Sequence, residues 1–375
     1  MNIDFHYYAT YCAALLAGYS HEQSMEICYS AQFVDLCSKT LLSKLKAPTN
    51  AATTQLQTEL ADTRTDIIGL QDITRIWSSF HFLPYDLYAV KPHRTRAYMR
   101  KYRLICKPNS DLLVKTVNLA RGGSLQHIGI AMHILADTWA HAYFAGTPSL
   151  VINNMSTEVL EVVTDEEGNE TEQRVKFKHT PGSPDDIENR VYTNTIYQGS
   201  ETSIMNLGHG RAGHLPDYSF IRYTYLPAWD GYRKILKDNP AEYYKAFTQM
   251  VYALKTIREG SEEFRKDIYD EKATAPYKER IKRIISTRQI SASQDWKEFG
   301  EELSGCTVDD FDINKYQDEY INASADDKDK TFLGRFIKGA LAQKGMVTDS
   351  IVKSGNPLAG MIRFKISKLK GAHHV

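Results

Sequence analysis

The chain has 375 residues, 42% of them hydrophobic and 25% charged, which is the mixture of an ordinary globular protein with one large domain or two smaller ones. Its 46 basic and 46 acidic residues cancel, so no overall field attracts the protein to nucleic acid or to a membrane. The five cysteines form no C-x-x-C pair, so the sequence suggests neither a thiolate zinc site nor a disulfide framework.

The N-terminal stretch "MNIDFHYYATYCAALLAGYS" does not resemble a signal peptide. It has no basic start, and Asp4 and His6 come before its apolar part. No run in the chain reaches the roughly 18 apolar residues that a membrane span needs. We therefore expect a cytoplasmic protein, with export by a route that uses no cleaved signal as the alternative.

Helical periodicity covers most of the chain. Residues 5–45 predict two helices, broken at Gly18, with Ser20 and Gln23 forming a capping box at the start of the second. A polar linker and a helix follow within 50–76, and further helices are predicted over 108–120 and 124–144. The helical period returns after Asn239-Pro240, which is a typical helix start.

One segment departs from this pattern. Between residues 157 and 178, two β-branched runs flank Glu167-Gly168-Asn169, which predicts a β-hairpin. We expect the hairpin to be a small excursion from a helical body. The predicted fold class is therefore all-α, a multi-helix bundle with this β-hairpin and a helical C-terminal extension.

The stretch "HILADTWAH" places three metal-binding side chains in one row. His133, Asp137 and His141 follow one another at intervals of four residues, so they share one face of the predicted helix. Asp137 has two carboxylate oxygens and can therefore bind one metal beside His133 and another beside His141. A cation would remove the high cost of burying the carboxylate. The alternatives are a polar stripe at the surface, or core histidines bonded to the backbone.

Four other places supply side chains of the same kind. Imidazole and carboxylate ligands together suit borderline cations, above all Zn²⁺. The candidate ligands are Asp4 and His6 in "DFHYY", Asp35 in "AQFVD", His81 in "FHFLP", and His209, His214 and Asp217 in "GHGRAGHLPDY".

The order of these residues resembles the zinc-dependent phospholipase C family and the single-strand nucleases that share its all-helical fold. The segments "FHYYATYCAALLAGYS", "SFHFLP", "LADTWAHAYFAG" and "GHLPD" are most similar to an uncharacterised bacterial family within that fold. The resemblance covers about residues 1–225. It implies a metal-binding helical catalytic domain over 1–230, with the hairpin inserted, and a helical extension packed on it over 231–375.

Carried over residue by residue, the resemblance implies a cluster of two or three zinc ions in which Asp137 bridges. The first ion would be held by Asp35, His81, His133 and Asp137, the second by His141, His214 and Asp217, and the third by His6 and Asp137. The chain departs from the family in three ways. His141 follows Asp137 by four residues instead of six, and His214-x2-Asp217 replaces His-x3-Glu, with His209 as a competing ligand. Since the N-terminal Trp of the secreted members is also absent, Asp4 is a candidate replacement ligand.

The activity that the resemblance implies is hydrolysis of a phosphodiester by metal-activated water. Asp35 or Asp4 could orient the water or take its proton. Arg211 is either a phosphate clamp or a surface arginine. The alternatives to a phospholipase C-like enzyme are a single-strand nuclease-like phosphodiesterase and a non-enzymatic, metal-stapled scaffold.

A phospholipid is preferred to nucleic acid as substrate because the sequence has no obvious basic and aromatic groove. The basic tail from Lys353 to Lys370 is the candidate for peripheral membrane contact. Apolar residues beside the motifs could also reach a membrane, although some of them must belong to the core. They are Phe80, Phe82, Leu83, Trp139, Tyr143 and Phe144.

Overall fold

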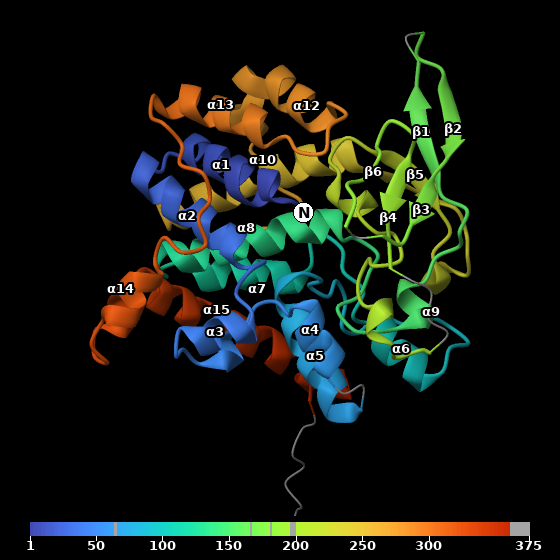
Figure 1. Ribbon diagram of the computed structural model, residues 1–375, viewed down its shortest axis with the longest axis horizontal. Coiled ribbons are helices and arrows are strands. Elements are labelled where there is room, and N and C mark those ends of the chain that lie inside the picture. Colours follow the sequence, from blue (N-terminus) through green and yellow to red (C-terminus); the bar gives the residue numbers. More distant parts are fainter. Residues whose placement is uncertain (64–65, 166, 181, 196–199, 361–375) are drawn as a thin grey trace, which may run out of the picture.

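Helix α8 (Leu125–Ala140) lies in the middle of the molecule, and other helices pack around it (Figure 1). The computed structural model describes residues 1–375 apart from 64–65, 166, 181, 196–199 and 361–375. The helices that pack against α8 are α2 (His21–Phe33), α5 (Ile67–Phe80), α7 (Asp111–Ala120), α10 (Asn239–Glu259) and α15 (Phe332–Lys353).

The sequence of α8 explains its central place. Every residue of the helix except Leu125 and His127 is buried, as expected for a helix that is apolar on all sides but one narrow polar row. Gly129 allows α2 to approach closely, since a Cβ at this position would lie 2.3 Å from the carbonyl oxygen of Ile27. The row of polar residues in α8 is therefore enclosed by other helices.

Helix boundaries agree with the sequence signals at several points. The capping box of Ser20 and Gln23 is present at the start of α2, and α10 begins at Asn239. Ser124 precedes α8 as predicted, but its hydroxyl contacts Nδ1 of His127 at 2.9 Å. The helix ends at Ala140, four residues earlier than predicted, and the chain turns at His141.

The remaining helical elements are short and cover the periphery. The α-helices are α1 (Thr10–Leu16), α3 (Lys39–Lys44), α4 (Gln57–Asp62), α6 (Arg96–Tyr102), α9 (Leu150–Asn153), α11 (Glu271–Thr274), α12 (Lys278–Ser286), α13 (Ser293–Ser304) and α14 (Gln317–Asn322). A π-helical turn, η1 (Asp4–Ala9), precedes α1.

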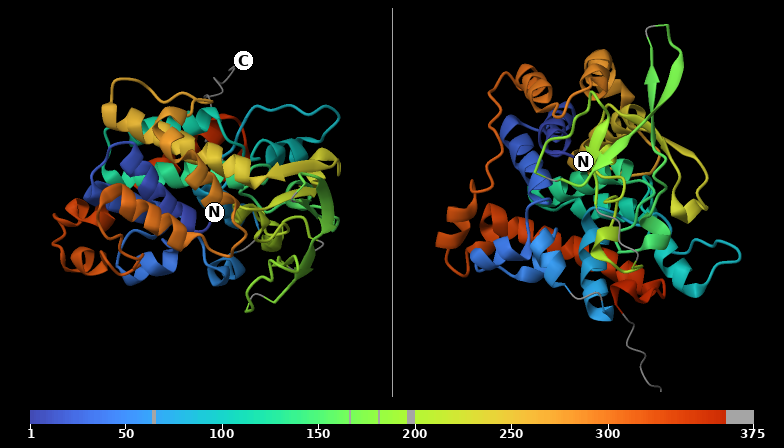
Figure 2. Two further views of the ribbon diagram at one scale, coloured as in Figure 1. Left: turned by 90° about the horizontal axis from the view of Figure 1, so that it is seen from above. Right: turned by 45° about the vertical axis from the view of Figure 1, so that its right-hand side comes forward.

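The predicted all-α fold class is wrong. The protein is a mixed α/β structure with 53% of its described residues in helices. Strands β2 (Glu170–Arg174), β1 (Leu160–Thr164), β5 (Arg222–Tyr225) and β6 (Ile235–Asp238) form an antiparallel sheet in that order. A separate parallel pair joins β3 (Lys176–Lys178) to β4 (Val191–Thr193). Both views in Figure 2 show the strands on one flank of the helical body.

The predicted hairpin exists, but it is not an isolated excursion. Strands β1 and β2 pair in register from Leu160 opposite Arg174 to Thr164 opposite Glu170, and β1 also pairs with the distant β5. Val159, Tyr223 and Tyr225 are buried in a second apolar cluster beneath the sheet. The hairpin is therefore one half of a sheet that covers its own core.

Helices on both sides of residue 230 share the main hydrophobic core. Met250 of α10 and Phe336 of α15 belong to the same cluster as Ile134 of α8. The predicted division into residues 1–230 and 231–375 stays a prediction. In the described part of the chain, no helix combines the length and apolarity needed to cross a membrane.

Candidate metal centre

Four parts of the fold bring histidine and aspartate side chains together beside α8. They are the turn η1, the turn after α2, the C-terminal end of α5 and the loop around residues 209–217. Within each group, the potential ligand atoms lie within 4.8 Å of one another. The three groups are His6, His133 and Asp137; Asp35, His81 and His133; and His141, His209 and Asp217.

Asp137 lies at the centre of this arrangement and is only 1% exposed. Its Oδ1 is 3.1 Å from Nε2 of His6, and its Oδ2 is 3.1 Å from Nε2 of His133 and 3.2 Å from Nδ1 of His81. The amino group of Met1 is 2.9 Å from Oδ1. The two carboxylate oxygens thus face different groups, which is the arrangement that a bridging ligand requires.

The surroundings of Asp137 favour its charged form. Burial alone would raise the pKa of this carboxyl group, but His141, the Met1 amino group, His133 and His6 outweigh it and hold the pKa well below its usual range. Asp137 therefore stays an anion in the core, where it requires positive partners.

Backbone carbonyls fix the proton positions of three histidines. His81 donates from Nε2 to the carbonyl of Thr53 at 3.1 Å, and His141 donates from Nδ1 to the carbonyl of His81 at 2.8 Å. His209 donates from Nδ1 to the carbonyl of Gly213 at 2.9 Å. Because a carbonyl oxygen only accepts, each of these ring nitrogens must carry the proton, and the other nitrogen of a neutral ring has a free lone pair.

The free lone pairs point at carboxylate oxygens. Nδ1 of His81 lies 3.2 Å from Oδ2 of Asp137 and 3.8 Å from Oδ1 of Asp35. Nε2 of His141 lies 3.3 Å from Oδ1 of Asp217, and the Met1 amino group lies 3.3 Å from that Nε2 and 3.2 Å from that Oδ1. Two acceptors that face each other repel unless a donated proton or a cation lies between them. Tetrahedral zinc with ligands at 2.0–2.1 Å sets neighbouring donors roughly 3.4 Å apart, so the observed separations fit such an ion.

The buried histidines are available as neutral ligands. Burial, with help from His133, lowers the pKa of His6 to about 4, and burial likewise lowers the pKa of His209 to about 4. Burial also lowers the pKa of His81. The rings of His6 and His133 stack with their centroids 3.8 Å apart, so protonation of both would place like charges in contact. Neutral imidazole is the form that binds metal.

The centre is closed on one side and reaches solvent on the other. His6, His133 and Asp137 are fully buried, whereas the side chains of Asp35 and Asp217 are 31% and 14% exposed. A small molecule can therefore approach the outer ligands without unfolding the core.

The structure brings His209 next to Asp217, and His214 lies elsewhere. Nε2 of His209 is 3.8 Å from Oδ2 of Asp217, while the His214 side chain is 53% exposed and its Nδ1 lies 2.8 Å from Oδ2 of Asp185. Asp185 also accepts hydrogen bonds from Thr193 and Tyr218. Of the two competing histidines, the geometry favours His209 as the ligand.

Two other predicted residues lie outside the three ligand groups. Arg211 is 1% exposed and donates from Nε and Nη2 to Oδ1 of Asn206, so the alternative of a surface arginine is wrong, and its role as a phosphate clamp stays a prediction. Asp4 accepts a hydrogen bond from the amide of Ala292 at 3.1 Å, and burial raises its pKa.

Of the apolar residues considered for membrane contact, all but Tyr143 are buried. Phe82 instead stacks on the ring of His141, with centroids 4.8 Å apart. Phe82 and Phe144 also lie beside the ring of His209, and apolar neighbours of this kind lower the local dielectric constant. Most of the basic tail, from residue 361 onward, lies outside the described residues.

Sequence reasoning missed the groups that orient the ligands. The carbonyls of Thr53 and Gly213 leave no side-chain signal, so no sequence pattern could have revealed them. Asp185 lies in "PGSPDD", which has the composition of a loop. Its partnership with His214 depends on the tertiary fold alone.

The chain belongs to the family described as "Family of unknown function (DUF6765)", whose model matches residues 1–351. No curated protein and no solved structure matches the chain. The matched range contains all the candidate ligands and continues past residue 230. The resemblance to phospholipase C stays a prediction.

Proposed function

We propose that this member of the DUF6765 family is a metal-dependent hydrolase of phosphodiesters, phospholipase C-like in its reaction, with two or three zinc ions. The observation that carries the proposal is the set of imidazole lone pairs directed at carboxylates around Asp137. Nδ1 of His81 faces Asp137 and Asp35 together, and among the described residues both ring nitrogens of His6 and Nδ1 of His133 are buried without a hydrogen-bond partner.

The residues that would hold the ions follow from the three groups. Asp137 would bridge, because its two oxygens face different histidines. One set would be Asp35, His81, His133 and Asp137, a second His141, His209 and Asp217, and a third His6 and Asp137. Zinc is the proposed metal because the donors mix imidazole nitrogen with carboxylate oxygen and include no thiolate.

The exposed edge of the centre supports catalysis over a purely structural role. A structural site is closed by protein ligands, whereas Asp35 and Asp217 border solvent. Bound ions of this type lower the pKa of a water molecule and stabilise the charge on phosphate oxygens. Asp35, the more exposed of the two carboxylates, is the proposed residue to orient that water or accept its proton.

The surrounding residues would hold the ligands in position. The carbonyls of Thr53, His81 and Gly213 fix the tautomers of three histidines, so their lone pairs point inward without any rearrangement. Phe82 covers one face of His141 and keeps water from it. This preorganisation is the contribution that a protein makes to metal-assisted hydrolysis.

We propose a phospholipid in preference to a nucleic acid as the substrate. With 46 basic and 46 acidic residues, the chain has no overall attraction for a polynucleotide. The choice is tested by offering vesicles, a single-stranded oligonucleotide and a chromogenic phosphodiester side by side.

The test combines metal analysis with this substrate screen. Wild type should contain zinc and hydrolyse at least the chromogenic phosphodiester, and Asp35→Asn should keep most of the metal while the rate falls by about 10²-fold or more. Bound metal without turnover of any substrate would favour the metal-stapled scaffold. Cleavage of the oligonucleotide alone would favour a nuclease, and protein without metal would overturn the proposal.

A further inference from the structure

The surface carries a basic segment with an apolar tip, which leads into helix α6 and continues through it. Between residues 87 and 110 the sequence has seven lysines and arginines and no acidic residue. The loop that precedes α6 exposes Tyr85, Tyr88 and Val90 to 45%, 66% and 80%. This teal segment projects at the right-hand edge of the second view in Figure 2.

The base of this loop is firmly held. Lys91 donates to the carbonyl of Trp229 at 2.5 Å, and Tyr98 donates to the same oxygen at 2.9 Å. Arg103 donates to the carbonyl of Ala89 at 3.0 Å. The loop tip is therefore presented by a fixed base.

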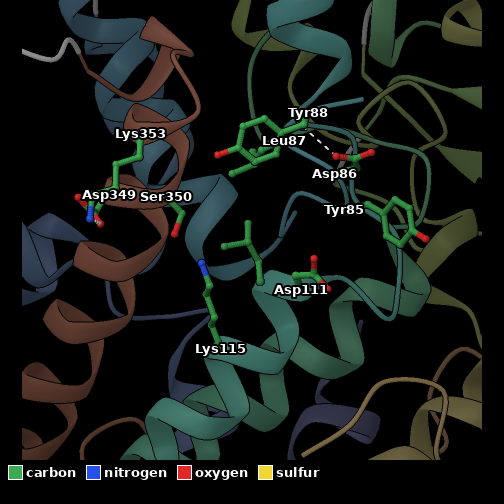
Figure 3. Close-up of a pocket in the computed structure, with 10 residues that line it drawn as sticks. Tyr85, Asp86, Leu87, Tyr88, Asp111, Lys115, Asp349, Ser350 and Lys353 are labelled. Carbon is green, nitrogen blue, oxygen red and sulfur yellow. Dashed lines mark hydrogen bonds and ion pairs between the residues drawn. The ribbon is translucent and has the colours of Figure 1, made fainter. Parts of the chain in front are cut away.

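One hydrogen bond joins two residues within the loop tip. Asp86 accepts the amide of Tyr88 at 2.8 Å, and Figure 3 shows this contact at the rim of a cavity of about 260 Å³. Tyr85 and Tyr88 both line that rim, on either side of Asp86. Exposure of single apolar residues is ordinary, but three within six positions, beside a run of cations, form a patch.

Positive charge follows the tip along the chain, whereas Asp86, Asp111 and Asp349 line the cavity beside it. Arg94 and Arg96 are exposed, and Arg94 lies over the ring of Tyr98 at 4.9 Å. Among the described residues, no ion pair involves Arg94, Arg96, Arg100 or Lys107, and Lys107 instead contacts the rings of Tyr85, Tyr143 and Trp229. The exposed charges of Arg94 and Arg96 are therefore available to an anionic partner.

We propose that residues 85–96 form a docking loop for an anionic membrane surface. Val90 and Tyr88 would enter the boundary between headgroups and acyl chains, and Arg94 and Arg96 would lie against anionic headgroups. The charge of the loop is complementary to such a surface, and its apolar tip fits the adjoining hydrocarbon.

The observations favour a lipid surface over single-stranded nucleic acid. Val90, the most exposed apolar residue of the loop, is aliphatic and cannot stack a base. Tyr98 and Tyr102 stack on each other at 5.8 Å, while Arg94 covers the ring of Tyr98 and Lys91 that of Tyr102. The rings of Tyr98 and Tyr102 are therefore not free to stack a base.

This inference does not rest on the proposed hydrolase activity. The membrane contact is assigned to described residues that the metal centre does not use. It is tested by binding alone, so its failure and the failure of the proposed function are separate results.

The test is sedimentation of the full chain with phosphatidylcholine vesicles, with and without phosphatidylserine. Wild type should bind the anionic vesicles and should bind less as salt increases. Since each basic residue near such a surface contributes about fivefold to partitioning, Arg94→Glu with Arg96→Glu should weaken binding by about 25-fold or more. Tyr88→Ser with Val90→Ser should weaken it severalfold.

Matched controls come from exposed residues of other elements. Ile321→Ser removes an apolar side chain that is 49% exposed, and Lys272→Glu with Lys278→Glu reverses two exposed charges. Both controls should bind as wild type does. Equal weakening by the controls, or no binding of wild type to anionic vesicles, would overturn the proposal. Binding of a single-stranded oligonucleotide that is lost only in the loop variants, without vesicle binding, would assign the loop to nucleic acid instead.

Discussion

Changing Asp137 to Asn tests the bridging carboxylate with little change of shape. The side chain keeps its size but loses its charge and one acceptor oxygen, so the contact of 2.9 Å between its Oδ1 and the Met1 amino group no longer joins opposite charges. Breaking a buried pair of this kind costs about 3–5 kcal/mol. For 375 residues the unfolding entropy is about 0.8 kcal/mol/K, so Tm should fall by about 4–6 °C even without metal.

Bound metal should add a second difference in thermal stability between wild type and Asp137→Asn. Zinc at about 100 times its Kd stabilises a folded protein by about 2.7 kcal/mol, which corresponds to a Tm increase of about 3 °C for a chain of this length. Wild type should show this increase in calorimetry when metal replaces chelator, and Asp137→Asn should not. Elemental analysis should show less bound metal in the variant than in a variant of any single ligand histidine.

Asp185→Asn provides the matched control. Asp185 is also buried and also contacts a histidine, His214, but it lies outside the three ligand groups. This control should lose stability and keep its metal. If Asp137→Asn kept the full metal content and the full metal-dependent Tm increase, the bridging assignment would be wrong.

Three further outcomes are expected. The pKa of His6 is about 4 in the folded chain and about 6.5 in an unfolded one, so the unfolded state takes up protons first as pH falls. The free energy of unfolding of the metal-free protein should therefore fall by about 2–3 kcal/mol per such histidine between pH 7 and 4.5, measured by urea titration. An unchanged urea midpoint would refute this. Gly213→Ala should cost about 2–4 kcal/mol and weaken metal binding, because φ is +60° and the new Cβ would lie 1.9 Å from the carbonyl of Thr193. Gly305→Ala, with a similar φ and no atom within 4 Å, should cost only about 1 kcal/mol and leave metal content unchanged, and equal metal loss in both would contradict the argument. Replacing residues 165–169, of which the described ones are exposed, by a two-residue turn should change stability by less than about 0.5 kcal/mol in thermal unfolding, whereas a larger loss would mean that this segment has a structural role.

The central helix and its row of ligands could be predicted because they depend on local periodicity. His133 and Asp137 are four residues apart in an apolar run, and that spacing alone places them on one face of α8. The structure adds the burial of that face and the convergence of His6, Asp35 and His81 upon it. Such convergence depends on how distant segments pack, for which a single sequence has no direct signal.

The choice between His209 and His214 could not be made from the sequence. Both histidines flank the same glycine-rich turn, and the turn closes through the bond from His209 to the carbonyl of Gly213. That closure directs Nε2 of His209 toward Asp217, while His214 turns to Asp185. A side-chain direction of this kind is a property of the folded loop.

The sheet was missed because two of its strands have only four residues. "RYTY" and "ILKD" are too short for an alternating pattern to stand out, and each is stabilised by pairing with another segment. The burial of Arg211 was missed for a similar reason, since its partner Asn206 is found only in the folded structure. Long-range pairing overrode the local signals at both places.

The most direct test of the metal centre is anomalous X-ray diffraction at the zinc edge, on crystals of protein that has never been exposed to a chelator. We predict two or three anomalous peaks, at least one of them roughly 2.0–2.2 Å from an oxygen of Asp137 and from Nδ1 of His81 or Nε2 of His133. A map without a peak beside Asp137, from protein whose elemental analysis also shows no bound transition metal, would contradict the account.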